Sequence, residues 1–166
     1  MKEIILDVET TGISSYDEVI EISVSDLNGD ILFYSRIKPT VKISSGALRL
    51  HGVSDEMLKN EPTIRQVLRR LKSIIMDADK IYCWSSDFVI HKLFKTARAM
   101  NADPRVFTHI QKHAVDLMYV IGKGDYWPRM DDVAQKHSIL WDGRRFSSIN
   151  DCKVISKIIK AIDKKE

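Results

Sequence analysis

The chain has 166 residues, of which 44% are hydrophobic and 30% are charged, and its formal net charge is +3. This length and composition are typical of one globular domain with a sizeable core, which excludes a disordered protein. No apolar run reaches the roughly 18 residues of a membrane-spanning helix, and no basic, apolar leader precedes a cleavage site, so we expect a cytoplasmic protein without membrane contact. Cys83 and Cys152 lie far apart, which predicts reduced thiols rather than a zinc site.

The first third of the chain predicts a three-stranded antiparallel meander. Residues 3–8 are an apolar strand, and residues 18–27 alternate apolar and polar side chains with the two-residue period of a half-buried strand. The sequence Asn-Gly-Asp at 28–30 is a strong hairpin signal. The chain then returns as a third strand over 31–39, which ends at a proline.

The remaining two thirds predict helices that alternate with strands. In chain order, the sequence predicts a short helix from Ser54, a helix over 64–76, a buried strand over 80–84, a helix over 87–100, a segment over 113–122 that begins as a strand, and helices over 130–137 and 149–162. A meander followed by such an alternation predicts an α/β fold in which helices flank a mixed sheet.

Two carboxylates end the first predicted strand. Asp7 and Glu9 lie two positions apart, so their side chains share one side of an extended strand. Neighbouring carboxylates repel each other unless cations lie between them, and hard divalent cations prefer oxygen ligands. A pair of such ions cleaves phosphodiesters in many nucleases. Thr10, Thr11 and Gly12 would then offer hydroxyls, N–H donors and room for a nucleotide, whereas a solvated turn is the alternative interpretation.

The longer string DVETTG, at residues 7–12, resembles the first motif of the DEDD exonucleases, the DnaQ-like proofreading family with a ribonuclease-H-like fold. The resemblance continues at 38–58, where a proline ends a strand and a His-Gly-Val-Ser turn leads into a short helix. It extends to the Val-Asp pair within 112–120 and to the helix at 130–139. Because the similarity covers essentially the whole chain in order, it implies a single exonuclease-like domain over 1–166.

This resemblance implies four carboxylates that bind two Mg²⁺ or Mn²⁺ ions, a His or Tyr general base, and removal of nucleotides from a 3′ end. Asp7 and Glu9 match the first two carboxylates, and Asp151 on the last predicted helix matches the fourth. A solvated acid that stabilises the start of that helix is the other interpretation of Asp151.

The third carboxylate departs from the family pattern. Residues 85–93 align Phe88 with the second motif but have Val89 where the carboxylate belongs. Asp87, two residues earlier, would replace it if the junction between strand and helix is shifted. An ordinary helix N-cap or first-turn acid is the alternative for Asp87.

The general base departs as well. Phe146 occupies the histidine position five residues before Asp151, and Ser147 occupies the position of the tyrosine variant. Four histidines lie in settings typical of packing or surface residues: His51, His91, His113 and His137. Loss of a base typically lowers the rate by a factor on the order of 10²–10⁴, so we expect weakened activity.

Basic and aromatic residues give modest support for nucleic-acid binding. Arg144 and Arg145 precede the last motif, where we expect them to approach substrate phosphates, and we count Arg145 with the residues at 10–12 as substrate-binding. Trp127 and Trp141 are candidates for base stacking, whereas burial is the expected role of Trp84.

Two hypotheses follow. The first is a 3′→5′ exonuclease that acts on single-stranded DNA or RNA through Asp7, Glu9, Asp151 and Asp87 with two divalent ions. The second is a non-catalytic relative that binds nucleic acid or a protein partner in a replication, phage or defence complex. Val89 and Phe146 separate the two, and the sequence does not choose between DNA and RNA.

Overall fold

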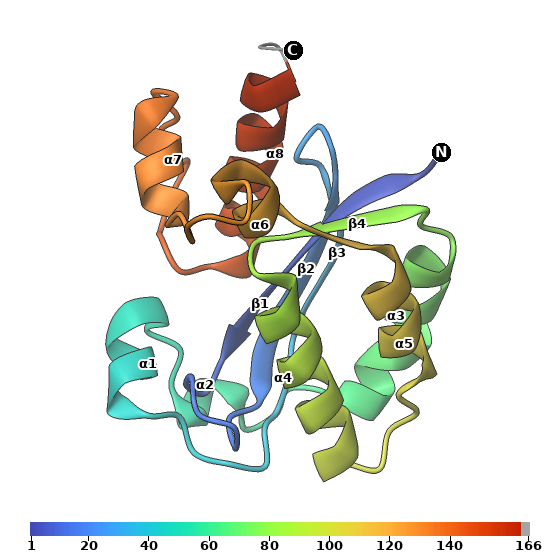
Figure 1. Ribbon diagram of the computed structural model, residues 1–166. Helices are drawn as coiled ribbons and strands as arrows, with labels where there is room; N and C mark the ends of the chain where they lie inside the picture. The colour runs from blue at the N-terminus through green and yellow to red at the C-terminus, as the bar shows by residue number, and fades with distance from the viewer. Residues whose placement is uncertain (164–166) are drawn as a thin grey trace.

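The fold is built on five strands in the order β3-β2-β1-β4-β5, in a computed structural model that describes residues 1–163 (Figure 1). The strands are β1 (Glu3–Thr10), β2 (Val19–Asp26), β3 (Ile31–Arg36), β4 (Lys80–Cys83) and β5 (Ala114–Asp116). Strands β1, β2 and β3 pair antiparallel, whereas β4 and β5 join β1 in parallel. The predicted mixed sheet with an N-terminal meander is therefore confirmed.

The helices cover both faces of this sheet (Figure 1). They are α1 (Ser45–His51), α2 (Asp55–Leu58), α3 (Ile64–Met76), α4 (Ser86–Ala99), α5 (Arg105–His113), α6 (Leu117–Gly122), α7 (Met130–Lys136) and α8 (Ser148–Asp163). Within the described residues, no helix has the length and apolar character needed to cross a membrane.

Strand β1 divides the core into two layers. Ile4, Leu6 and Val8 pack in one cluster with apolar residues of α3, α4 and α5. Ile5 packs on the opposite side with residues of α6, α7 and α8. Since side chains alternate along a strand, Asp7 and Glu9 share the face of Ile5 and lie on the side covered by α8.

Four segments differ from the sequence prediction. Helices α1 and α5 form where the sequence predicted no helix; α1 begins after the N-cap Ser44 and ends at Gly52, which has a left-handed backbone. Strand β5 has only three residues, because the Asp116 side chain accepts a hydrogen bond from the Tyr119 N–H and starts α6 at once. Strand β3 ends at Arg36, before the predicted proline.

Candidate active site

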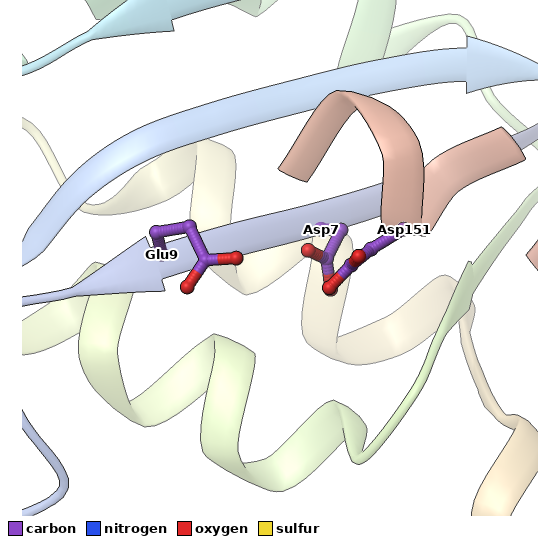
Figure 2. Close-up of side chains that lie close together, drawn as sticks. All are labelled: Asp7, Glu9 and Asp151. Carbon is purple, nitrogen blue, oxygen red and sulfur yellow. The ribbon is translucent and has the colours of Figure 1, made fainter. Parts of the chain in front are cut away.

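Three carboxylates converge at the carboxyl end of β1. Asp7 and Glu9 come from β1 and Asp151 from the first turn of α8, and Figure 2 shows the carboxyl groups of Asp7 and Asp151 pointing toward each other beside β1. One ligand oxygen from each of the three residues lies within 4.8 Å of the others. The exposed fraction is 8% for Asp7 and 9% for Asp151, so the cluster is largely removed from water.

Strand β2 holds the start of α8 over this cluster. Ser23, the cross-strand partner of Asp7, has its hydroxyl 2.7 Å from the Ser148 hydroxyl. The Cys152 thiol lies 3.7 Å from the Ser23 carbonyl oxygen, to which it donates a weak hydrogen bond. Ser148 and Cys152 flank Asp151 along α8, so these two contacts aim the Asp151 carboxylate at Asp7.

The electrostatics of the cluster favour a bound cation. Burial, with the charges of Asp151 and Glu9, raises the pKa of Asp7 well above its usual value. Burial and the charges of Asp151 and Glu21 raise the pKa of Glu9 to about 8. Burial likewise raises the pKa of Asp151 to about 7. No ion pair within residues 1–163 involves any of the three, so their mutual repulsion is not relieved by a Lys or Arg contact.

One carboxylate oxygen of the cluster lacks a hydrogen-bond partner. The Oδ1 atom of Asp151 is buried and has no hydrogen-bond partner in the described part of the chain. A buried acceptor without a partner is destabilising by roughly 1–3 kcal/mol, and more when it is charged. A divalent cation that prefers carboxylate oxygens would satisfy this atom and relieve the repulsion, so the donor set fits Mg²⁺ or Mn²⁺.

Glu21 is a fourth buried acid that the sequence reasoning missed. It lies on β2 directly opposite Glu9 and is 4% exposed. The Tyr34 hydroxyl donates to it at 3.0 Å and the Arg36 Nε at 3.1 Å. Both partners bind the Oε1 atom of Glu21, and its carboxylate adds negative charge near Glu9 without belonging to the three-carboxylate cluster. The alternation of β2 placed Glu21 on one side of its strand, but only the register with β1 brings it to Glu9.

A cavity of about 480 Å³, hereafter the Glu9 cavity, opens beside the cluster. It is lined by Val8, Glu9, Thr10, Gly12, Ile13, Ser44, Gly46, Ala47, Arg49, Leu50, His51 and Phe88. Most of these residues come from the end of β1 and from α1, the helix that the sequence did not predict. A cavity of this size with a mainly apolar lining and a few polar groups is typical of a small-molecule or nucleotide site.

A family model described as "Exonuclease" matches residues 4–159. The chain belongs to this exonuclease family. The "Uncharacterized exonuclease CP81" of Escherichia phage 186 is 25% identical over 171 residues, which cover 97% of this chain and 88% of the phage protein. A PolC-type DNA polymerase III of Halalkalibacterium halodurans is 37% identical over 79 residues, which cover 45% of this chain and only 6% of the polymerase.

Solved exonuclease structures share the fold. An exonuclease I structure superimposes with a TM-score of 0.80 at 13% identity, over 98% of this chain and 41% of the other. The nuclease domain of 3'hExo, a DEDDh family member bound to rAMP, gives a TM-score of 0.77 at 17% identity, over 98% and 92% of the two chains. The predicted ribonuclease-H-like exonuclease fold is thereby confirmed.

In this exonuclease-family chain, Val89 occupies the position where the resemblance leads us to expect the third carboxylate, and its side chain lies in the core. Val89 is 2% exposed and packs in the cluster beneath β1. Asp87 is exposed in the first turn of α4, and it does not join the carboxylate cluster of the described residues. The Asp116 carboxylate accepts hydrogen bonds from the Ser86 N–H at 2.6 Å and the Ser86 hydroxyl at 3.0 Å, which hold the start of α4 in this orientation.

Phe146, at the position where the resemblance leads us to expect a general base, carries no basic group. Phe146 has a left-handed backbone with φ of 56° and is 36% exposed. No histidine among residues 1–163 joins the carboxylate cluster. His109 and His113 stack on each other and lie against the carbonyl oxygens of Ala78 and Asp79, which precede β4 at the end of the parallel strands opposite to the cluster.

His51 lines the Glu9 cavity, but both of its ring nitrogens are engaged. Its Nδ1 atom accepts a hydrogen bond from the Val53 N–H at 3.0 Å, which leaves Nε2 to donate to the Thr10 carbonyl oxygen at 3.1 Å. Burial lowers the pKa of His51, which favours this neutral form. His51 therefore orders the end of β1 and is not available to take a proton from water.

The hydroxyls of Thr10 and Thr11 are used within the chain. Thr10 donates to the Gly12 carbonyl oxygen at 2.8 Å, and Thr11 donates to Asp17 at 2.7 Å. The Asp17 carboxylate lies against Gly12, where an added Cβ would meet one of its oxygens at 2.6 Å. These contacts shape the lip of the Glu9 cavity, to which Thr10 and Gly12 both contribute.

The two neighbouring arginines point in different directions. Arg145 forms an ion pair with Asp131, and its guanidinium lies over the rings of Trp141 and Phe146 at 5.7 and 5.4 Å. Arg144 instead reaches α1, where its Nη2 atom lies 3.4 Å from the Leu50 carbonyl oxygen. The two arginines therefore lie in separate environments, whereas the sequence led us to expect both in one cleft.

The tryptophans also differ in their environments. Trp84 is 8% exposed and belongs to the core cluster beneath α8, as its expected burial requires. Trp127 is 65% exposed with its ring 6.3 Å from that of Tyr119. Trp141 is partly buried against the α8 cluster and carries Arg145 on its face.

Proposed function

We propose that this chain is a 3′→5′ exonuclease that hydrolyses the terminal phosphodiester of single-stranded DNA or RNA, with Mg²⁺ or Mn²⁺ held by Asp7, Glu9 and Asp151. The observation that carries the proposal is the cluster of the buried Asp7 and Asp151 with the half-buried Glu9, with an unpartnered oxygen of Asp151, beside a nucleotide-sized cavity. Membership of the exonuclease family supports hydrolysis of nucleic acid.

The chain's own residues would orient the substrate. The Glu9 cavity would take the terminal nucleoside, with the Phe88 ring and the Leu50 side chain against its base. Base stacking on aromatic rings contributes roughly 1–3 kcal/mol per base and depends little on sequence. The carboxylates then lie at the phosphate that links this nucleoside to the rest of the strand. When bound, divalent ions supply an activated water and stabilise the leaving oxygen.

Related structures include exonucleases bound to nucleic acid. One is a zinc-bound complex of E. coli ExoI with ssDNA, which supports a single-stranded substrate, and another concerns 3′-end recognition of the histone mRNA stem-loop by a 3′-exonuclease. The partial match to polymerase III proteins suggests a replication setting, in which a protein partner would be present. We propose Thr10, Thr11, Gly12 and Arg145 as further residues near the substrate path.

We expect the hydrolysis to be slow. Phe146 offers no proton acceptor at the base position, and the absence of a base lowers the rate by a factor on the order of 10²–10⁴. With Val89 buried in the core, the described residues offer three carboxylates for the ions, namely Asp7, Glu9 and Asp151. The same two positions favour a second candidate function, namely a non-catalytic relative that binds nucleic acid or a protein partner.

The test is degradation of labelled oligonucleotides. Single-stranded DNA and RNA with a 5′ label should give a ladder of products shortened from the 3′ end in Mg²⁺ or Mn²⁺, and a blocked 3′ end should prevent it. The Asp7→Ala protein is the control, because activity that survives this change would come from a contaminant. Absence of cleavage with either ion and either nucleic acid would overturn the enzyme proposal in favour of the binding protein.

A further inference from the structure

The loop between α7 and α8 contains one arginine whose charge is already neutralised and one whose charge is not. Arg145 is held by Asp131 and by the two aromatic rings beneath it. Arg144 forms no ion pair in the described part of the chain, and its single side-chain hydrogen bond is the 3.4 Å contact with Leu50. A guanidinium has five N–H donors in a rigid fork, so most of those of Arg144 are free for a ligand.

The backbone of Arg144 is fixed next to the carboxylate cluster. The Asn150 side chain donates to the Arg144 carbonyl oxygen at 2.8 Å, and Asn150 immediately precedes Asp151 on α8. Gly143 has φ of +136° and lies against the same amide, which a Cβ would approach to 2.9 Å. The start of α8 therefore positions both Asp151 and the backbone from which the Arg144 side chain extends.

The side chain of Arg144 lies directly on the backbone at the end of α1. A Cβ added to Gly52 would meet the Arg144 Nη1 atom at 2.6 Å. Leu50 and His51, which precede Gly52, line the Glu9 cavity. The absence of a side chain at Gly52 thus lets the guanidinium rest at the rim of this cavity, where the loop before α8 meets α1.

The guanidinium lies beside the wall of the Glu9 cavity, because Leu50, whose carbonyl oxygen it approaches at 3.4 Å, lines that cavity together with Glu9. Its positive charge opposes the upward shift of the Glu9 pKa and contributes to the lowering of the His51 pKa. No ion pair joins Arg144 to any of the three cluster carboxylates. A cation on one side and ion-binding carboxylates on the other leave an electrostatically favourable place for an anion between them.

We propose that Arg144 binds the scissile phosphate of the nucleic acid, opposite the ions held by the carboxylate cluster. This proposal rests on the proposed function and names the residue that orients its reacting group. Arg144 would hold a non-bridging phosphate oxygen while the adjoining nucleoside occupies the Glu9 cavity. In a site without a general base, such positioning of the phosphate is a main contribution that the chain itself can make.

The first test measures binding without cleavage. Fluorescence anisotropy in the Asp7→Asn background, with single-stranded DNA or RNA over a range of salt concentrations, compares Arg144 with Arg144→Ala. Loss of one phosphate contact should weaken binding about tenfold and reduce the slope of log K against log[salt] by about 0.7. Arg69→Ala on α3 is the control, since Arg69 is exposed and its loss changes the net charge equally.

Two more variants separate contact from charge and from folding. Arg144→Lys should keep the salt slope but not the full affinity, because Lys lacks the planar fork. Gly52→Asn keeps Arg144 yet puts a Cβ against its guanidinium, and Asn tolerates the left-handed backbone, so binding should weaken as in Arg144→Ala. Unchanged melting temperatures and unchanged Mn²⁺ affinity of Arg144→Ala would show that fold and ion site are intact.

The outcomes distinguish this proposal from the proposed function. If Arg144→Ala binds with the affinity and salt slope of its parent, or if Arg69→Ala weakens binding as much, the role of Arg144 is overturned even when the protein cleaves. If the protein binds as expected but never cleaves, the enzyme proposal fails and the role of Arg144 in phosphate binding stands. Absence of any nucleic-acid binding by the parent protein overturns both.

Discussion

The two halves of the candidate active site are built from different materials. The half on β1 and α8 consists of the buried Asp7 and Asp151 and the half-buried Glu9, and contacts between β2 and α8 position Asp151. The half on α4 and the loop before α8 has an apolar residue in the core at Val89, an exposed acid at Asp87 and an aromatic ring at Phe146. The first half is electrostatically incomplete without a cation, whereas in the second half Val89 packs in the core and the Phe146 ring lies beneath the Arg145 guanidinium.

The carboxylate half on β1 and α8 is therefore the half that indicates a bound ligand. Burying three acids together raises the free energy of the folded chain, because each loses hydration and repels the others. A cation would relieve this repulsion. Val89, by contrast, is explained by its packing in the core and needs no ligand. Substitutions can remove the carboxylate half or restore a base to the other half, and a change of pH measures the electrostatic repulsion in the carboxylate half.

The largest effect is expected for Asp7→Asn, which removes one charge from the carboxylate half. Nuclease activity should fall by at least about 10³-fold, since a single lost electrostatic contact in an active site typically lowers the rate by 10²–10³. The stabilisation of the fold by Mn²⁺, seen as a rise in melting temperature, should disappear as well. Asp77→Asn, at an exposed acid after α3, is the matched control and should change neither. Full activity in Asp7→Asn would remove the carboxylate cluster from the mechanism.

Phe146→His should restore part of the missing half. A base typically contributes on the order of 10²–10⁴ in rate, and imperfect alignment should leave a gain of about 10- to 100-fold in kcat. His is among the residues enriched at positive φ, so the 56° at this position should tolerate it. Single-turnover cleavage against pH measures the gain. Phe146→Asn, which has no basic group, is the comparison, and an equal gain in both variants would exclude general-base catalysis.

The metal-free protein should lose stability as the pH rises. The pKa of Glu9 is about 8 in the folded chain and about 4.3 in an unfolded one, so the folded state binds the proton more tightly between these values. Its stabilising effect is present below pH 4.3 and is lost on approaching pH 8. The pKa of Asp151, at about 7, acts in the same direction.

Thermal melts in EDTA between pH 5 and 8 should therefore show a decrease of about 5–10 °C, which corresponds to a few kcal/mol. Saturating Mn²⁺ at pH 8 should reverse the decrease, because the ion binds the ionised carboxylates. Asp7→Asn should flatten the pH dependence, since it removes one of the interacting charges. A melting temperature that rises with pH in EDTA would contradict the proposed repulsion.

The smallest effect is expected for Asp87→Asn. Asp87 is exposed at the start of α4 and does not join the cluster, so kcat/KM should change by less than about 3-fold, within the range of surface substitutions. Asp151→Asn, measured in parallel, should lose activity as Asp7→Asn does. An equal loss in Asp87→Asn would show that α4 turns toward the cluster when ions bind, which would make the second half part of the metal site.

The amino-acid sequence was enough to predict the helices and strands that follow from a periodic local pattern. The alternation of β1 places Asp7 and Glu9 on one face, and the Asn-Gly-Asp turn at 28–30 predicts the meander that pairs with it. The 3.6-residue period marks α3 and α8. With the resemblance of residues 7–12 to the exonuclease motif, these patterns were enough for the fold, because each is set by neighbours in the chain.

Which side chains reach the candidate active site depends on the tertiary structure and could not be predicted from local pattern. Asp151 meets Asp7 through the Ser23–Ser148 contact, which joins residues 125 positions apart. The direction of a side chain at a junction depends on one or two backbone angles, such as the left-handed φ at Phe146, and no periodic pattern encodes these. The two neighbouring arginines show the same limit of local pattern, because the loop packs Arg144 on Gly52 of the chain after α1 and pairs Arg145 with Asp131.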